Sequence, residues 1–317
     1  MENININNPS KTIVKRKLKL PMVFAFIIII LCIFGSIKII QTFNDKNDNK
    51  IDHEKEENKT LDNDKDSAIE EVIKEDETKV SKKTKLYKEE YKDRYDSYKE
   101  KHSDLSDEKI VLYVNIGIDQ EFYTNTKDSL RTGTTLALVN KFYYLDRYVP
   151  NDLVEINSQY KVSGKEVKMT KEAAAAFEKL AEAAKKDGLT VRAMSTYRSY
   201  DYQNTLYTNY ANKDGKEKAD TYSARAGYSE HQTGLAVDVD NAKVSYTSFG
   251  STNEFTWMKN HAHEYGFILR YTAENEFITG YKNEPWHYRY VGVEIATQMK
   301  KENISSYEEY YFMYLDN

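Results

Sequence analysis

The pattern of hydrophobic and polar positions begins with one long apolar stretch near the start of the chain. Residues 20–37 carry no charge and are mostly apolar. As a helix they would extend roughly 27 Å, close to the thickness of a bilayer's hydrocarbon core. Ile39 and Ile40 lengthen the stretch. We therefore predict a transmembrane anchor over residues 20–40. A cleaved signal peptide is the alternative, although its apolar region is usually shorter.

Charged residues flank this stretch on both sides. Residues 1–19 end in a basic cluster, and basic residues before a span favour a cytoplasmic N-terminus. We therefore predict a single-pass membrane protein with a cytoplasmic tail at residues 1–19 and an extracellular catalytic region. Residues 41–84 are rich in Asp, Glu, Lys and Asn and contain few apolar side chains. Such a segment buries too little apolar surface to fold, so we predict a disordered charged linker.

The remaining chain has the mixed periodicity of a folded domain. Four tyrosines between residues 85 and 101 recur at helical spacing, which predicts an amphipathic helical stalk over residues 85–108. Its tyrosine stripe can pack on the domain that follows or on a second copy of the chain. We predict that the compact domain covers residues 109–317.

Within residues 109–317, helical and strand patterns alternate irregularly. Helices are predicted at 170–186 (capped by Thr170 and ended by Gly188), 200–210, 255–265 and 292–300. Strands are predicted at 110–116, 189–194, 235–240, 267–271 and 286–291, and residues 212–220 are interpreted as a polar insertion. Because no regular strand–helix–strand rhythm is present, the fold class is predicted to be α+β.

Composition narrows the functions that are possible. The net charge is −5 and no basic stripe or nucleic-acid motif is present, so nucleic acid is excluded as a partner. The single cysteine, Cys32, lies in the apolar stretch, so the chain cannot form an internal disulfide.

Two short segments, residues 229–238 and 284–292, carry the candidate chemistry. They contain His231, Asp238 and His287, three possible metal ligands, together with the carboxylate of Glu284. Three N/O ligands with a fourth position for water are what a hydrolytic zinc site needs. Pro285 argues against a helix between Glu284 and His287. The chain has no His-Glu-x-x-His motif, which excludes the helical class of zinc proteases.

The two segments also resemble a known family. The pattern Ser-x-His-x-x-Gly-x-Ala-x-Asp over residues 229–238, followed by Glu-x-x-His over 284–287, resembles the VanY-type zinc D-alanyl-D-alanine carboxypeptidases of the LAS group of metallopeptidases. Further matches are Leu-Val-Asn-Lys at 138–141, Tyr-Arg-Ser-Tyr at 197–200 and Gly-Phe-Ile-Leu-Arg-Tyr at 266–271. The likeness covers roughly residues 115–297. It implies a small antiparallel sheet with flanking helices and one zinc ion per chain.

The resemblance also implies roles for individual residues. The zinc ligands would be His231, Asp238 and His287, and Glu284 would be the general base and then the general acid. Arg198 would face the substrate near the scissile bond, and Gln203 and Ser229 would line the same pocket. The implied substrate is the stem peptide of peptidoglycan, which would lose its terminal D-alanine.

Other functions remain open on the sequence. A related cell-wall metallopeptidase, either a D,D-dipeptidase or an endopeptidase, would use the same ligands. A non-catalytic wall-binding module would not need Glu284 beside the ligands. A serine hydrolase built on Ser229, His231 and Asp238 is disfavoured, because no strand–turn–helix elbow surrounds the serine.

Overall fold

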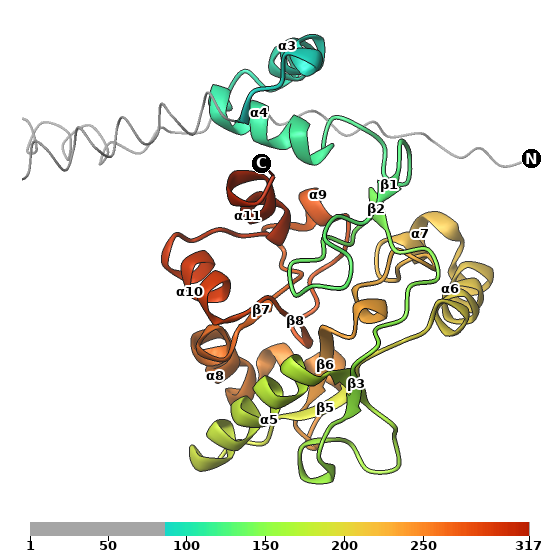
Figure 1. Ribbon diagram of the computed structural model, residues 1–317, viewed down its shortest axis with the longest axis vertical. Coiled ribbons are helices and arrows are strands. Elements are labelled where there is room, and N and C mark those ends of the chain that lie inside the picture. The colour runs from blue at the N-terminus through green and yellow to red at the C-terminus, as the bar shows by residue number, and fades with distance from the viewer. Residues whose placement is uncertain (1–85, 317) are drawn as a thin grey trace, which may run out of the picture. The chain divides into compact units, whose positions relative to one another are not determined.

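A four-stranded antiparallel sheet lies at the centre of the residues that position the candidate chemistry. The computed structural model describes residues 86–316. The strands run in the order β5 (Arg192–Ser195), β6 (Ala236–Asp240), β8 (His287–Tyr290) and β7 (Phe267–Leu269). Figure 1 shows this sheet at the centre, with α5 (Lys171–Lys186) and α8 (Asn253–His261) beside it. The predicted α+β class with a small antiparallel sheet and flanking helices is confirmed.

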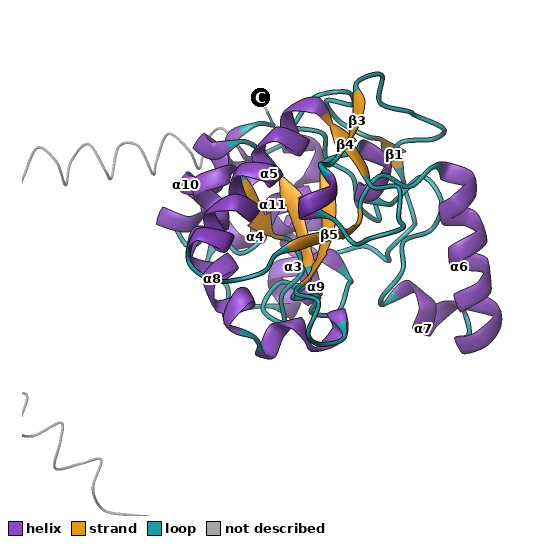
Figure 2. Cartoon of the chain, turned by 90° about the horizontal axis from the view of Figure 1, so that it is seen from below, coloured by secondary structure: helices purple, strands orange, loops and turns teal. Residues whose placement is uncertain are grey.

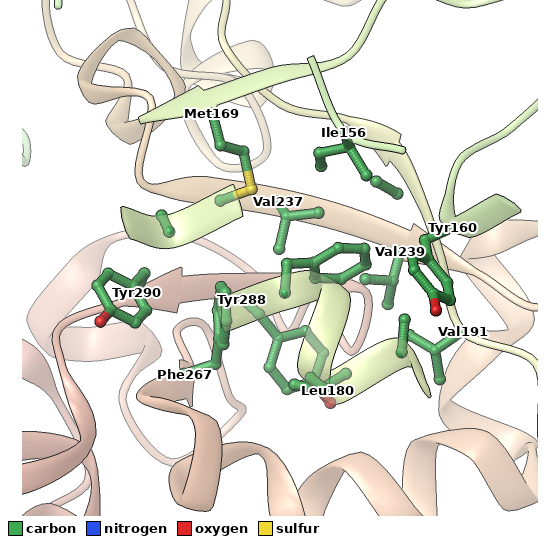
Figure 3. Packing of buried hydrophobic residues seen from close by; sticks show 14 of the residues in the cluster. Ile156, Tyr160, Met169, Leu180, Val191, Val237, Val239, Phe267, Tyr288 and Tyr290 are labelled. Carbon is green, nitrogen blue, oxygen red and sulfur yellow. The ribbon is translucent and has the colours of Figure 1, made fainter. Parts of the chain in front are cut away.

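One face of the sheet packs on α5 to form the first hydrophobic core. Side chains at alternate positions of β6 and β8, including Val237, Val239 and Tyr288, are fully buried against Phe177 and Leu180 of α5. Figure 3 labels Leu180 together with Val237, Val239 and Tyr288 in this cluster of packed side chains. Because successive strand residues point to opposite faces, Asp238 and His287 point away from this core. The core therefore fixes the face on which the candidate chemistry lies.

A second core joins the two ends of the described chain. The helices α3 (Lys92–Lys101), α4 (Asp107–Ile116), α10 (Val293–Lys301) and α11 (Tyr307–Tyr314) pack together around Ile268, Ile278 and Val291. Tyr95 and Tyr98 of α3 are buried here, so this part of the predicted stalk packs on its own domain.

The remaining elements form the rim of the domain. They are η1 (Glu89–Tyr91), the parallel pair β1 (Lys127–Asp128) and β2 (Tyr143–Tyr144), the antiparallel pair β3 (Leu153–Glu155) and β4 (Lys168–Thr170), η2 (Ser158–Tyr160), α6 (Tyr200–Asp214), α7 (Lys216–Asp220), η3 (Glu230–Thr233), η4 (Tyr246–Ser251), η5 (Ala262–Tyr265) and α9 (Glu276–Thr279). In Figures 1 and 2, α6 and α7 project together to one side of the sheet.

The strand predicted at residues 110–116 is wrong, because this stretch is helix α4. Ser106 caps its N-terminus by accepting a hydrogen bond from the Lys109 amide, and Gly117 ends it in the left-handed conformation. Every residue from Ile110 to Ile116 is buried, so no polar face marks the helical period. A short apolar run of this kind does not distinguish strand from helix.

Other predicted elements were close to those observed. The helix predicted from Thr170 is α5, but the Thr170 side chain makes no capping hydrogen bond. The polar insertion at 212–220 is helical, since α6 continues to Asp214 and α7 follows. The predicted anchor and linker, residues 20–84, lie outside the described residues. Between residues 86 and 316, no helix combines the length and apolar character that a bilayer crossing requires.

Candidate metal centre and active site

The three predicted metal ligands meet on the sheet face opposite α5. Asp238 lies in β6, and His287 begins β8 as its direct partner across the two strands. His231 lies in η3, which ends at Gly234 and leads into β6. Gly234 has a φ of +70°, and a Cβ there would lie 2.8 Å from Leu153. The turn that places His231 beside Asp238 therefore requires glycine at this position.

The donor atoms fit a zinc ion. Nε2 of His231 is 3.3 Å from Oδ2 of Asp238, and Nδ1 of His287 is 3.1 Å from Oδ1. One donor atom from each of the three residues lies within 4.8 Å of the others, and all three residues are buried. In tetrahedral zinc with bonds of about 2.0–2.1 Å, neighbouring ligand atoms are about 3.3 Å apart. The two imidazoles and one carboxylate are also the donor types that zinc binds.

Hydrogen bonds and burial orient His231 for metal binding. Its Nδ1 is 2.6 Å from the carbonyl oxygen of Thr196, so Nδ1 carries the proton and donates it to that oxygen. Nε2 therefore has the free lone pair, which can bind a metal ion, and this atom faces Asp238. Burial and the nearby Arg198 lower the pKa of His231 to about 4. This imidazole is thus neutral at pH 7, as metal binding requires.

His287 presents the other ring nitrogen. Its Nδ1 faces Asp238, and its Nε2 lies 3.5 Å from Oε2 of Glu230. Burial opposes a charge on this ring, but the carboxylates of Asp238 and Glu230 outweigh burial and raise its pKa to about 9. Because metal binding needs the Nδ1 lone pair, zinc has to displace a proton here, which makes zinc affinity dependent on pH.

Glu284 lies beside the metal ligands without belonging to them. Its side chain is 13% exposed, and its Oε2 is 3.8 Å from Nδ1 of His287. Burial and the charge of Asp238 raise its pKa to about 7, against the opposing effect of His287 and Arg198. A carboxyl with a pKa near the working pH can both accept and return a proton.

Arg198 lies on the other side of Asp238. Its Nη2 donates to Oδ2 of Asp238 at 2.6 Å, and its Nε donates to the Ser195 hydroxyl at 3.1 Å. Its Nη1 is 3.5 Å from the amide oxygen of Gln203, whose own Nε2 donates to the Ala224 carbonyl. Gln203 is only 1% exposed. It therefore braces Arg198 against the cleft wall.

The predicted site residues all line one cleft of about 610 Å³. Arg198, Gln203, Ser229, Glu284 and the three ligands are among its lining residues, with aromatic and charged side chains of α6 and of residues 281–286 on the rim. Ser229 is buried at the start of η3 and makes no side-chain capping hydrogen bond there. A second hollow, of about 520 Å³, is lined by α4, α9 and α11 and contains none of these groups.

Lys141 supports the cleft wall, although its role was not predicted. It is 3% exposed, and its ammonium donates to the carbonyls of Asp220 and Gly280 at 2.8 and 2.6 Å. The rings of Phe122 and Tyr281 lie 4.8 and 4.3 Å from it. Burial lowers its pKa to about 8. This cation joins the end of α7 to the loop that leads to Glu284. In the sequence, the only signal for this role was the position of Lys141 in the Leu-Val-Asn-Lys motif.

A buried charge cluster behind His287 was also missed. It consists of Glu230, Arg270, Arg289 and Glu308, whose side chains are fully enclosed. Their sequence separations of 38 to 59 residues leave no local pattern by which they could be paired.

Comparisons with known proteins agree with this geometry. Residues 166–293 match the family model VanY, D-alanyl-D-alanine carboxypeptidase. The putative carboxypeptidase YodJ of Bacillus subtilis (strain 168) is 39% identical over 208 residues, which cover 61% of this chain and 75% of that protein. A D-alanyl-D-alanine carboxypeptidase of Enterococcus faecium is 32% identical over 196 residues, covering 59% of this chain and 61% of that protein.

A solved structure shares the fold. The LdcB LD-carboxypeptidase, described for its recognition of peptidoglycan, is 39% identical and has a TM-score of 0.56, with 59% of this chain and 90% of that chain covered. The chain is thus similar to carboxypeptidases in both sequence and structure, and its donor set fits zinc. The chain therefore belongs to the VanY family of D-alanyl-D-alanine carboxypeptidases and is a zinc-dependent hydrolase.

Proposed function

We propose that this protein is a membrane-anchored extracellular carboxypeptidase that removes the terminal D-alanine from peptidoglycan stem peptides. The observation that carries the proposal is the convergence of His231, Asp238 and His287 in one cleft, with Glu284 beside them and outside the ligand set. The relatives named as D-alanyl-D-alanine carboxypeptidases support this choice of substrate.

The three ligands would hold zinc, and Glu284 would move the proton. Bound zinc supplies Lewis acidity, which acidifies water and polarises a carbonyl. Glu284 accepts the proton of the attacking water on a carboxylate oxygen and returns it to the nitrogen of the departing D-alanine. Burial raises the pKa of Glu284 above its usual range in the metal-free protein, so this carboxyl lies in an environment where it can hold a proton.

Arg198 would meet the negative charge of the substrate. Its guanidinium is fixed by Ser195 and Asp238, so it is in place before the substrate arrives. A fixed cation stabilises the oxyanion that develops on the scissile carbonyl, or the terminal carboxylate of the peptide. Gln203 accepts a long hydrogen bond from the guanidinium, and Ser229 lines the same cleft.

The position of the cut can be tested directly. The purified full-length protein with zinc is incubated separately with a stem pentapeptide ending in D-Ala-D-Ala, with a tetrapeptide ending in a single D-alanine, and with free D-Ala-D-Ala. Mass analysis follows each product. Loss of one alanine from the pentapeptide supports the proposal. An internal cut indicates an endopeptidase, and cleavage of the free dipeptide alone indicates a dipeptidase.

Glu284→Gln supplies the control for catalysis. This variant keeps the shape of the side chain but cannot accept the proton, so we expect unchanged zinc content and a loss of turnover of about 10²–10⁴-fold. Retained activity would show that Glu284 is not the base. Zinc and peptide bound without turnover by the unaltered protein would instead favour the wall-binding module.

A second candidate function is L,D-carboxypeptidase activity. The similarity to the LdcB LD-carboxypeptidase favours it, because that match covers 90% of the solved chain. Preferential loss of alanine from the tetrapeptide in the same assay would identify this activity.

The cellular location forms a separate part of the proposal. It rests on the apolar residues 20–40 and the basic flank before them. We expect the protein to stay with membranes after alkaline extraction, and residues 86–316 to be cleaved by protease added to intact wall-free cells. Recovery in the soluble fraction would contradict the anchor and leave the activity unaffected.

A further inference from the structure

The buried charge cluster meets the metal centre at Glu230, the neighbour of the ligand His231. Oε1 of Glu230 accepts hydrogen bonds from Nε of Arg270 at 2.8 Å and from Nη1 of Arg289 at 2.9 Å. Its Oε2 is buried and has no hydrogen-bond partner in the described part of the chain. The basic atom facing Oε2 is Nε2 of His287, at 3.5 Å. One oxygen of this carboxylate is thus fixed, and the other is directed at a metal ligand.

His287 lacks the matching hydrogen bond on its side of this contact. Its Nε2 is also buried without a hydrogen-bond partner among residues 86–316. A neutral imidazole that binds metal through Nδ1 carries its proton on Nε2. That proton points at Oε2 of Glu230, and a small approach of the two groups would complete the hydrogen bond. Ligating histidines usually donate their second N–H to such an acceptor, which fixes the tautomer and the ring orientation.

The C-terminal helix α11 holds the other end of the cluster. Glu308 receives two hydrogen bonds from Arg270, from Nη1 to Oε2 at 2.9 Å and from Nη2 to Oε1 at 2.6 Å. Asn140 donates to the same carboxylate at 3.1 Å. The guanidinium of Arg270 is therefore held between two carboxylates, those of Glu230 and Glu308. Helix α11 lies beyond residues 166–293, which match the family model.

Charge balance makes Glu308 necessary to this arrangement. The cluster contains two arginines and two glutamates, all fully enclosed. Without Glu308, one buried positive charge would be uncompensated. Arg270 would then compete with His287 for the carboxylate of Glu230. Both effects act against a dication bound next to His287. Buried ion pairs contribute little net stability, because desolvation offsets their attraction, so stability alone is a weak reason for such a cluster.

We propose that Glu308 is a positioning residue for the metal centre: it fixes Arg270, Arg270 and Arg289 fix Glu230, and Glu230 fixes His287 with Nδ1 toward the metal. The inference rests on the proposed zinc site. It assigns to the C-terminal helix a part in metal binding that runs through Arg270 and Glu230.

The test compares Glu308→Gln with Glu309→Gln in the full-length protein. Zinc dissociation constants are measured by competition with a chelating dye, and unfolding of the metal-free proteins is measured in urea. Glu308→Gln should weaken zinc binding by about 10–100-fold, the range seen when partners of ligating residues are removed. Glu309 caps α11 through Ser306 and lies outside the cluster. Its variant should lose stability and keep the zinc affinity of the unaltered protein.

A double variant tests the order of the contacts. If Glu308 acts through Glu230, then adding Glu308→Gln to Glu230→Gln should weaken zinc binding no further. Independent, multiplying losses would overturn the proposal, as would equal zinc affinity in Glu308→Gln and the unaltered protein.

A neutral pair covers the case in which Glu308→Gln fails to fold. The Arg270→Met, Glu308→Gln protein removes one charge of each sign, and we still expect weaker zinc binding because Glu230 loses one of its two anchors. Unchanged affinity there would also refute the inference. If the unaltered protein binds no zinc, the proposed function fails instead, so the two failures are distinguishable.

Discussion

Replacement of Lys141 by methionine should change how the stability of the protein depends on pH. Methionine has a similar length and no charge, so it fills the space between Phe122 and Tyr281 but cannot donate to the carbonyls of Asp220 and Gly280. The loss of those bonds changes stability by an amount that does not depend on pH. The titration of the ammonium adds a part that does, and this second part can be calculated.

The pKa of Lys141 is lowered from 10.5 to about 8 by burial. The unfolded chain therefore binds more protons than the folded chain between pH 8 and 10.5, so the free energy of unfolding rises with pH in this window. From pH 7 to pH 9.5, the linkage relation gives a gain of about 2 kcal/mol for the unaltered protein. Lys141→Met lacks this group and should lack the gain.

Urea unfolding of both proteins at pH 7 and pH 9.5 measures the effect. All other titrating groups are common to the two proteins, so the change in their stability difference isolates Lys141. We expect this difference to shift by about 2 kcal/mol in favour of the unaltered protein at the higher pH. If the two stability profiles stay parallel within about 0.5 kcal/mol, Lys141 has an ordinary pKa and the burial argument is wrong.

Two further predictions concern the cleft and the turn beside it. Arg198→Lys keeps the positive charge but loses the planar fork that contacts Ser195 and Asp238, so kcat of the zinc-loaded protein should fall about 10²-fold. A change in KM alone would argue against an oxyanion role. Gly234→Ala should cost about 2–4 kcal/mol in urea unfolding, from its positive φ and the contact with Leu153. The matched control Gly188→Ala has a positive φ but no neighbour within 4 Å, and an equal loss there would refute the steric part.

The metal centre could be predicted because its signals are local. His231, Gly234 and Asp238 fall within eight residues, and the alternation of Leu235, Val237 and Val239 already indicated which face Asp238 would occupy. The resemblance then added Arg198, which in the structure donates a hydrogen bond to the carboxylate of the ligand Asp238. The short spacing and the strand period were sufficient to predict that His231 and Asp238 lie together.

The supporting contacts could not be predicted, because they join distant parts of the chain. Arg270 and Arg289 were interpreted only as strand residues, and helix α11 was not predicted at all. Its tyrosine-rich sequence is buried nearly all round, so it shows no clear apolar stripe. The same ambiguity gave a strand in place of α4. Buried charges that neutralise one another only in the folded chain leave no signal in the order of residues.

The direct pairing of Asp238 with His287 across β6 and β8 means that strand alignment and ligand geometry are one property. A slip of one residue would place Trp286 or Tyr288 opposite the aspartate and turn the imidazole toward α5. A metal ion can therefore bind only when the two strands are correctly aligned, and its binding stabilises that alignment over every other one. Between these strands the chain runs out through α8 and returns through β7, Arg270 and Glu284, so it brings further residues of the centre back to the same pair of strands.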